Sequence, residues 1–187
     1  MSELADTLAS LSRVLDGRSL PWFVFGAQAV AVRGAPRATQ DVDITVQVDR
    51  GDLGPLVLAL QEEGLRHRYP EIAEELVESG AVLPLVHPSG MEVDLVVAGS
   101  GLEAVVLAGA TPASIDGVLV PVAHATHLVV MKLLAGRGKD LDDVRALLAS
   151  EDVDLAEATE LLRQLEQALG QSDLLRNLEA AIDDVGA

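Results

Sequence analysis

The hydrophobic pattern divides the first 123 residues into short strands and short helices. Leucines at helical spacing predict a first helix that begins at Ser2 and ends at Gly17. Short apolar runs bounded by Gly, Pro or polar residues predict strands, and helical periodicity predicts the helices between them. The expected strands cover 22–25, 41–48, 81–87, 91–98 and 118–122, and the expected helices cover the segment after Gly26 up to Gly34, 52–63, 70–79 and a short stretch within 99–110.

After residue 124 the pattern is helical to the end of the chain. The expected helices cover roughly 125–135, 140–149, 154–169 and 172–184. This change of pattern predicts an α/β (α+β) fold with two regions, a core over 1–123 built on a small mixed β-sheet with helices packed on it, and a C-terminal helical region over 124–187 packed on that core.

One helix in the second region leaves the oligomeric state open. Its leucines are as compatible with a dimer interface as with an internal core, so a homodimer is one of the assemblies considered. These leucines are Leu161, Leu162, Leu165 and Leu169.

Composition and charge narrow the class of protein. Half of the 187 residues are hydrophobic, cysteine is absent and the formal net charge is −17. Extensive nucleic-acid binding is not expected, because the acidic surface repels phosphate backbones and aromatic residues are only 2% of the chain. The N-terminus lacks a signal-peptide pattern and no apolar run approaches the ~20 residues that span a bilayer, so we expect a cytoplasmic protein without membrane contact.

Two carboxylates open the second strand. Asp41 and Asp43 are two residues apart, so both side chains point to the same face, with Cα atoms roughly 6–7 Å apart. Val42, Ile44 and the following valines form the other, apolar face. Carboxylates at that spacing can share Mg²⁺ ions, and two such ions can stabilise the attacking and leaving oxygens of a phosphoryl displacement. The alternative is an ordinary polar strand edge.

A later strand repeats the same spacing with Glu92 and Asp94. If this strand lies beside the first pair, one of its acids completes a metal site. Asp94 is the stronger candidate because the apolar run 95–97 follows it, and Glu92 is held in reserve. An amphipathic strand without function is the alternative.

Gly26, Ala27 and Gln28 follow a strand and open a helix. Free backbone N–H groups and the helix dipole at such a position favour phosphate, and glycine lets phosphate approach closely. Many strand-to-helix turns carry glycine for backbone reasons alone, so this turn is a candidate nucleotide contact only in combination with the acids.

Four further polar residues are candidates for nucleotide binding. Arg37 lies between the turn and the acids, where it can pair with a triphosphate or with Asp41 or Asp43. Thr39 favours a local backbone bond over a substrate contact. Lys132 and Lys139 belong to a second basic cluster, and Lys132 either reaches solvent or points into a charged cleft.

The four histidines show no metal-ligand spacing, so structural roles are expected for His67, His87, His124 and His127.

Taken together, these motifs resemble the nucleotidyltransferase fold of the DNA polymerase beta superfamily. The resemblance rests on Phe25-Gly26-Ala27, on Arg37-x-Thr39-x-Asp41-Val42-Asp43-Ile44 and on Val93-Asp94-Leu95. Within that superfamily, the closer resemblance is to small bacterial AbiEii-like nucleotidyltransferases of the type IV toxin–antitoxin kind, which Lys132-Leu133-Leu134-Ala135 and Lys139-Asp140 also match. The resemblance covers about residues 20–150.

The resemblance implies roles for these residues. Gly26 and Ala27 would hold the triphosphate of an NTP, Asp41 and Asp43 would bind two Mg²⁺ ions, with Mn²⁺ as a substitute, and Asp94 would bind one and help to activate a hydroxyl acceptor. Ala27 departs from the usual Gly or Ser, which keeps the backbone N–H but removes a serine hydroxyl.

Three functions follow from this reading. The first is a Mg²⁺-dependent enzyme that transfers a nucleoside monophosphate from an NTP to a hydroxyl of a protein, a small molecule or a tRNA end, with a cognate toxin or antitoxin protein as a further partner. The second is a non-catalytic module that binds a nucleotide or a partner. The third is a structural interaction protein.

Overall fold

The computed structural model describes residues 2–34, 39, 41–79, 82–99, 101–149 and 153–186. They form two compact units, one made of Met1–Gln28 and Ala38–Ala123, the other of Ala29–Arg37 and His124–Ala187. Among the described residues, all strands belong to the first unit. No helix in these ranges is long and apolar enough to cross a membrane.

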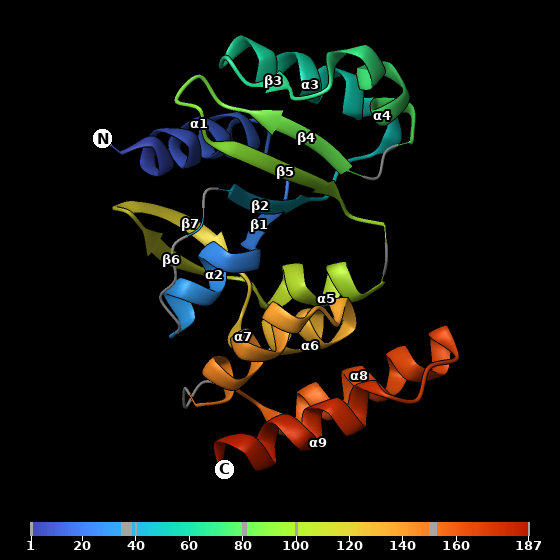
Figure 1. The fold of residues 1–187 in the computed structure, drawn as a ribbon. Coiled ribbons are helices and arrows are strands. Elements are labelled where there is room, and N and C mark those ends of the chain that lie inside the picture. Colours follow the sequence, from blue (N-terminus) through green and yellow to red (C-terminus); the bar gives the residue numbers. More distant parts are fainter. Residues whose placement is uncertain are drawn as a thin grey trace. The chain divides into compact units, whose positions relative to one another are not determined.

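The first unit is built on one mixed sheet, which confirms the predicted fold class (Figure 1). Among the described residues the sheet has seven strands in the order β3-β4-β5-β2-β1-β7-β6. β2 runs parallel to β5 and β1 runs parallel to β7, and the other neighbours are antiparallel. The strands are β1 (Trp22–Phe25), β2 (Asp41–Val46), β3 (Arg66–His67), β4 (Val82–Val86), β5 (Glu92–Val97), β6 (Thr111–Ile115) and β7 (Val118–Val122).

Side-chain alternation explains the core of this sheet. In β2, Val42, Ile44 and Val46 are fully buried, whereas Asp41 and Asp43, which alternate with them, are half-buried. This pattern is typical of a strand whose apolar face packs against helices and whose other face carries polar groups.

Helices precede the first strand and connect several of the others, and α1 shows how the sequence forms them. Ser2 caps α1 by accepting a hydrogen bond from the Ala5 N–H, and the buried residues Leu8, Leu11 and Leu15 recur on one face. The helices up to residue 123 are α1 (Glu3–Gly17), α2 (Gly26–Arg33), the 3₁₀ turn η1 (Arg50–Asp52), α3 (Leu53–Glu62), the 3₁₀ turn η2 (Pro70–Ile72), α4 (Ala73–Ser79) and α5 (Gly101–Gly109).

The second unit contains α6 (Ala125–Ala135), α7 (Gly138–Leu148), α8 (Leu155–Leu169) and α9 (Leu174–Val185). The Asp154 backbone N–H donates to the Thr126 hydroxyl at 2.9 Å, which ties the start of α8 to α6. Of the leucines considered for a dimer interface, Leu162 is fully buried within this unit and Leu169 is 53% exposed. Leu162 therefore belongs to an internal core.

Local elements differ from the prediction in a few places. The predicted helix over 70–79 begins with the 3₁₀ turn η2, and α7 begins two residues earlier than expected, at Gly138. β3 and β6 were not predicted, because β3 has only two residues and β6 carries Pro112 and polar neighbours in place of an apolar run.

Candidate active site

The register between β2 and β5 brings four carboxylates to one part of the sheet. Asp43 lies opposite Asp94, and Asp41 lies opposite Glu92. Residues opposite one another on neighbouring strands point to the same face, and the strands are only about 4.8 Å apart. Asp41, Asp43 and Asp94 are all half-buried, whereas Glu92 is exposed. The third acid chosen from the sequence is thus the direct neighbour of Asp43.

The turn between β1 and α2 packs against this group. Gly26 has a φ of +65°, in the left-handed region that favours glycine, and a Cβ atom added there would lie 2.6 Å from the Asp43 Cγ. Ala27 and Gln28 are buried, and the Gln28 side-chain amide donates to the Asp41 backbone carbonyl at 3.5 Å. The absence of a side chain at Gly26 therefore lets the start of α2 contact the Asp43 carboxylate.

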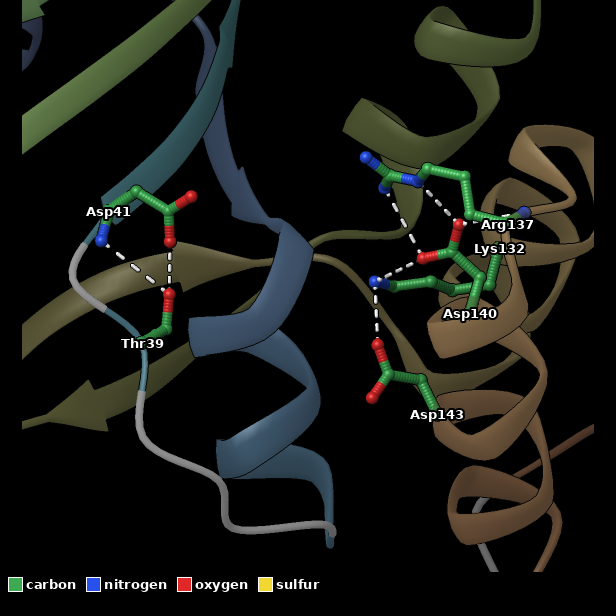
Figure 2. Close-up of polar contacts among 6 residues, drawn as sticks. All are labelled: Thr39, Asp41, Lys132, Arg137, Asp140 and Asp143. Atoms are coloured by element: carbon green, nitrogen blue, oxygen red, sulfur yellow. Dashed lines mark hydrogen bonds and ion pairs between the residues drawn. The ribbon is translucent and has the colours of Figure 1, made fainter.

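Thr39 binds locally to Asp41. Its hydroxyl donates to the Asp41 carboxylate and accepts a weak hydrogen bond from the Asp41 N–H at 3.5 Å (Figure 2). Arg37, a candidate for the triphosphate, lies outside the described residues.

Arg68 contacts the acids from the neighbouring strands, and the sequence had not pointed to it. Its guanidinium donates to the carboxylates of both Glu92 and Asp94, and the side chain is only 19% exposed. The Arg68 N–H donates to the Pro84 carbonyl at 2.9 Å, which fixes the backbone beside β4. Arg68 follows the two-residue strand β3, and nothing in the local pattern places it near residue 94.

These contacts determine how the carboxylates are oriented. Asp41 is bound to Thr39, and Asp94 is bound to Arg68. Within the ranges that the structure describes, no three His, Asp or Glu side chains converge closely enough to hold a metal ion as they stand. A metal at this position would compete with Arg68 for the Asp94 carboxylate.

In the second unit, Lys132 is buried in an ion-pair network. Its ammonium lies 3.0 Å from an Asp140 oxygen and 2.7 Å from an Asp143 oxygen, and all three side chains are at most 7% exposed (Figure 2). The Arg137 side chain also donates to Asp140 at 2.7 Å. This network links α6 to α7. It gives Lys132 a structural role, and nucleotide binding by Lys132 stays a prediction, as it does for the exposed Lys139.

The charges around Asp140 act on its ionisation. Burial raises the pKa of this carboxyl, but hydrogen bonds from Arg137 and Lys132 and their positive charges outweigh that effect. The pKa of Asp140 is therefore below its ordinary value, and the carboxylate form is favoured.

Three of the four histidines make structural contacts. His124 Nδ1 accepts from the Thr126 N–H at the start of α6, and His127 Nε2 lies 3.1 Å from a Glu157 oxygen. His87 is buried, with Nδ1 2.8 Å from the Ser89 hydroxyl. Burial lowers the pKa of His87, and the carboxylates of Asp6 and Glu63 oppose this shift.

No model of a known protein family matches the sequence, and neither does any curated protein. Solved structures, in contrast, resemble the chain. The crystal structure of ANT(2'')-Ia in complex with adenylyl-2''-tobramycin has a TM-score of 0.58 at 17% identity and covers 89% of this chain and 98% of that one. A nucleotidyltransferase-like antigenic protein from Paracoccidioides brasiliensis has a TM-score of 0.54 at 20% identity, with 96% and 94% covered.

A third structure is the lincosamide antibiotic adenylyltransferase LnuA with bound lincomycin. Its TM-score is 0.50 at 15% identity, and the aligned region covers 79% of this chain and 96% of the LnuA chain. The chain has the nucleotidyltransferase fold. The narrower resemblance to AbiEii-like toxin–antitoxin proteins has no counterpart among these structures and stays a prediction.

On this nucleotidyltransferase fold, the carboxylates and the glycine turn form one chemical unit. The turn presents backbone N–H groups at a helix start, which suit an anion, and the acids beside it suit a hard cation. An anionic ligand next to three carboxylates requires such a cation between them. The arrangement is therefore suited to a metal–phosphate complex.

Proposed function

We propose that this protein is a Mg²⁺-dependent nucleotidyltransferase that moves a nucleoside monophosphate from an NTP to a hydroxyl group of a small molecule. The observation that carries the proposal is the adjacency of Asp43 to both Asp94 and Gly26, since it combines paired carboxylates with a glycine turn whose geometry suits phosphate. The fold shared with known nucleotidyltransferases supports it.

The residues present fit magnesium. The donors are carboxylate oxygens, the ligands that Mg²⁺ prefers, and the missing side chain at Gly26 lets the Asp43 carboxylate lie directly against the turn. Asp41, Asp43 and Asp94 would hold two Mg²⁺ ions, for which Mn²⁺ is a substitute. When bound, these ions would offset the negative charge of the triphosphate and of the departing pyrophosphate.

The chain's own groups have distinct tasks in this proposal. The N–H groups of Gly26 and Ala27 bind the triphosphate, and Gln28 holds the strand carrying Asp41 against the turn. Asp94 accepts the proton of the acceptor hydroxyl as its oxygen attacks the α-phosphorus. The bond between the α-phosphorus and the oxygen that bridges it to the β-phosphate breaks, and pyrophosphate leaves. Arg37, Thr39, Lys132 and Lys139 stay predicted nucleotide contacts.

A small-molecule acceptor agrees best with the charge of the chain. A net charge of −17 opposes broad binding of RNA and favours cationic or neutral acceptors. ANT(2'')-Ia in complex with an adenylylated tobramycin and LnuA with bound lincomycin are similar folds with antibiotic ligands. A protein acceptor, a tRNA end and a toxin–antitoxin partner are the alternatives within the same reaction class.

A non-catalytic module that retained the fold is the second candidate. Two observations favour it: Ala27 lacks the hydroxyl of the usual serine, and Arg68 already neutralises Asp94. Such a module would bind nucleotide without turnover.

A transfer assay distinguishes the two candidates. The protein is incubated with each of the four NTPs labelled at the α-phosphate, with Mg²⁺, and with a panel of hydroxyl-bearing aminoglycosides and lincosamides. The proposal predicts an α-labelled product and released pyrophosphate with wild type, loss of both with Asp41→Asn, and retention with Asp49→Asn, an exposed acid beyond β2. Nucleotide binding without any labelled product would favour the non-catalytic module.

A further inference from the structure

A groove of about 450 Å³ lies between α3, β3 and α4, within the first unit. Its apolar lining comes from Val57 and Leu58 on α3 and from Ala73 and Val77 on α4. His67 of β3 lines it as well, whereas the next residue, Arg68, reaches Asp94. Neither Arg68 nor the carboxylates of Asp41, Asp43 and Asp94 line the groove. It is a separate feature from the candidate active site.

The groove exposes apolar surface that the fold leaves uncovered. Leu58 is 62% exposed although it lies on the groove wall, and Ile72, directly before Ala73, is 39% exposed. Buried His67 Nδ1 has no hydrogen-bond partner among the described residues, and burial lowers the pKa of His67, which favours the neutral form of its ring. Clustered exposed apolar side chains beside a hollow are typical of interaction sites.

Acidic residues border this apolar surface. Glu74 and Glu78 line the groove one helical turn apart on α4, and Glu71 and Glu75 lie beside them. All four are exposed, and none forms an ion pair with another described residue. Neither η2 nor α4 contains Lys or Arg. The Arg50 guanidinium donates to the backbone carbonyl of Glu78 at the end of α4 and forms no ion pair with these carboxylates. The border therefore presents negative charge that no ion pair among the described residues offsets, next to an apolar floor.

We propose that this groove binds a basic amphipathic helix of another protein. The apolar side chains of such a helix would cover Leu58 and Val77, and its Lys or Arg residues would pair with Glu74 and Glu78. The ten residues of α3 extend for about 15 Å, which matches roughly three turns of a bound helix. A second copy of this chain fits less well, because two molecules of net charge −17 repel each other.

A designed peptide tests the proposal with the full-length protein. The probe is a fluorescein-labelled 15-residue helix of Leu and Lys with the leucines on one face. The control peptide has the same composition with the leucines spread around the helix. Binding is measured by fluorescence anisotropy at low and high salt. We expect the amphipathic peptide to bind at least tenfold more tightly than the control peptide.

Matched variants locate the binding. Leu58→Ser should weaken binding at least fivefold, and Leu119→Ser, which changes a leucine that is 68% exposed on β7, should not. Glu74→Gln with Glu78→Gln should weaken binding at low salt and much less at high salt. The control for this pair is Glu179→Gln with Asp183→Asn, an exposed acid pair at the same spacing on α9.

Hydrogen exchange supplies the independent measurement, with protection by the peptide expected over 53–62 and 73–79. Equal affinity for the two peptides, equal loss from Leu58→Ser and Leu119→Ser, or protection elsewhere would overturn the proposal. So would a homodimer, seen by sedimentation velocity, that Leu58→Ser dissociates, since it would assign the groove to a second copy.

Discussion

Replacing Gly26 by Ala should destabilise the first unit through two separable effects. The first is backbone strain, because Gly26 has a φ of +65°. The second is steric overlap, because the new Cβ would meet the Asp43 side chain, with 2.6 Å to its Cγ and 2.9 Å to its Cβ. Both the strand β2 and the start of α2 would have to shift to relieve this overlap.

The magnitude follows from these two terms. A non-glycine residue in the left-handed region costs about 1–2 kcal/mol, and forcing an extra methyl group into a packed position costs typically about 1–3 kcal/mol. We therefore expect Gly26→Ala to lower the free energy of unfolding by about 2–5 kcal/mol. Gly117→Ala provides the strain term alone, since Gly117 has a φ of +85° and no atom within 4 Å of an added Cβ.

Urea denaturation followed by circular dichroism measures both variants. The steric term is the difference between Gly26→Ala and Gly117→Ala, and we expect about 1–3 kcal/mol. Adding Asp43→Ala to Gly26→Ala should recover part of this difference, because it removes the overlapping carboxylate. If Gly26→Ala costs no more than Gly117→Ala, the turn does not pack against Asp43 and the site geometry described above is wrong.

Three further variants test other parts of the structure. Lys132→Met leaves buried Asp140 and Asp143 without the lysine and should destabilise the second unit by about 3–5 kcal/mol in urea denaturation. Arg68→Gln removes the cation bound to Asp94 and should tighten Mn²⁺ binding several-fold by calorimetry. His87→Gln should reduce the loss of thermal stability between pH 7.5 and 5.5, in melting curves at the pH values named, because the lowered pKa of His87 favours its neutral form.

Each of these variants has a contradicting outcome. A cost below about 1 kcal/mol for Lys132→Met would mean that the ion-pair network is solvated like a surface pair. Unchanged Mn²⁺ affinity in Arg68→Gln would show that Arg68 does not compete with a metal.

For His87, the direction of the pKa shift determines how stability changes with pH. The stabilising contribution of a histidine with a lowered pKa is present above its ordinary value of 6.5 and is lost as the pH falls through the folded-state pKa. An unchanged pH profile in His87→Gln would assign the acid sensitivity to other groups, such as His67.

The sequence predicted the elements whose patterns are local. The strands at 22–25 and 41–48, the hairpin of β4 and β5 around Pro88-Ser89-Gly90 and the four C-terminal helices follow from apolar periodicity and turn residues. All are confirmed, although β2 ends at Val46, two residues earlier than predicted. Local patterns did not predict β3 or β6. A two-residue strand has no periodicity, and β6 exists only because its backbone pairs with β7.

The sequence predicts the parts of the candidate site whose geometry is set by spacing within one strand. It does not predict the parts whose geometry is set by pairing between strands. Asp41 and Asp43 share a face because they are two residues apart in one strand. The position of Asp94 beside Asp43 depends on the parallel register of β2 with β5, which about fifty residues of chain separate, and sequence spacing does not set it. The contact of Arg68 with Asp94 and the burial of Lys132 between two aspartates also arise from tertiary packing.

Calorimetric titration of Mg²⁺-NTP tests the central claim most directly, because it needs no acceptor. ATP, CTP, GTP and UTP are titrated with and without Mg²⁺ into wild type, into Asp41→Asn with Asp43→Asn, and into the control pair Asp49→Asn with Asp52→Asn, which changes two exposed acids after β2. We predict Mg²⁺-dependent binding of at least one NTP by wild type and the control pair, and none by the Asp41 and Asp43 variant. Equal binding by all three proteins, or no binding of any NTP, would contradict a nucleotidyltransferase site at these carboxylates.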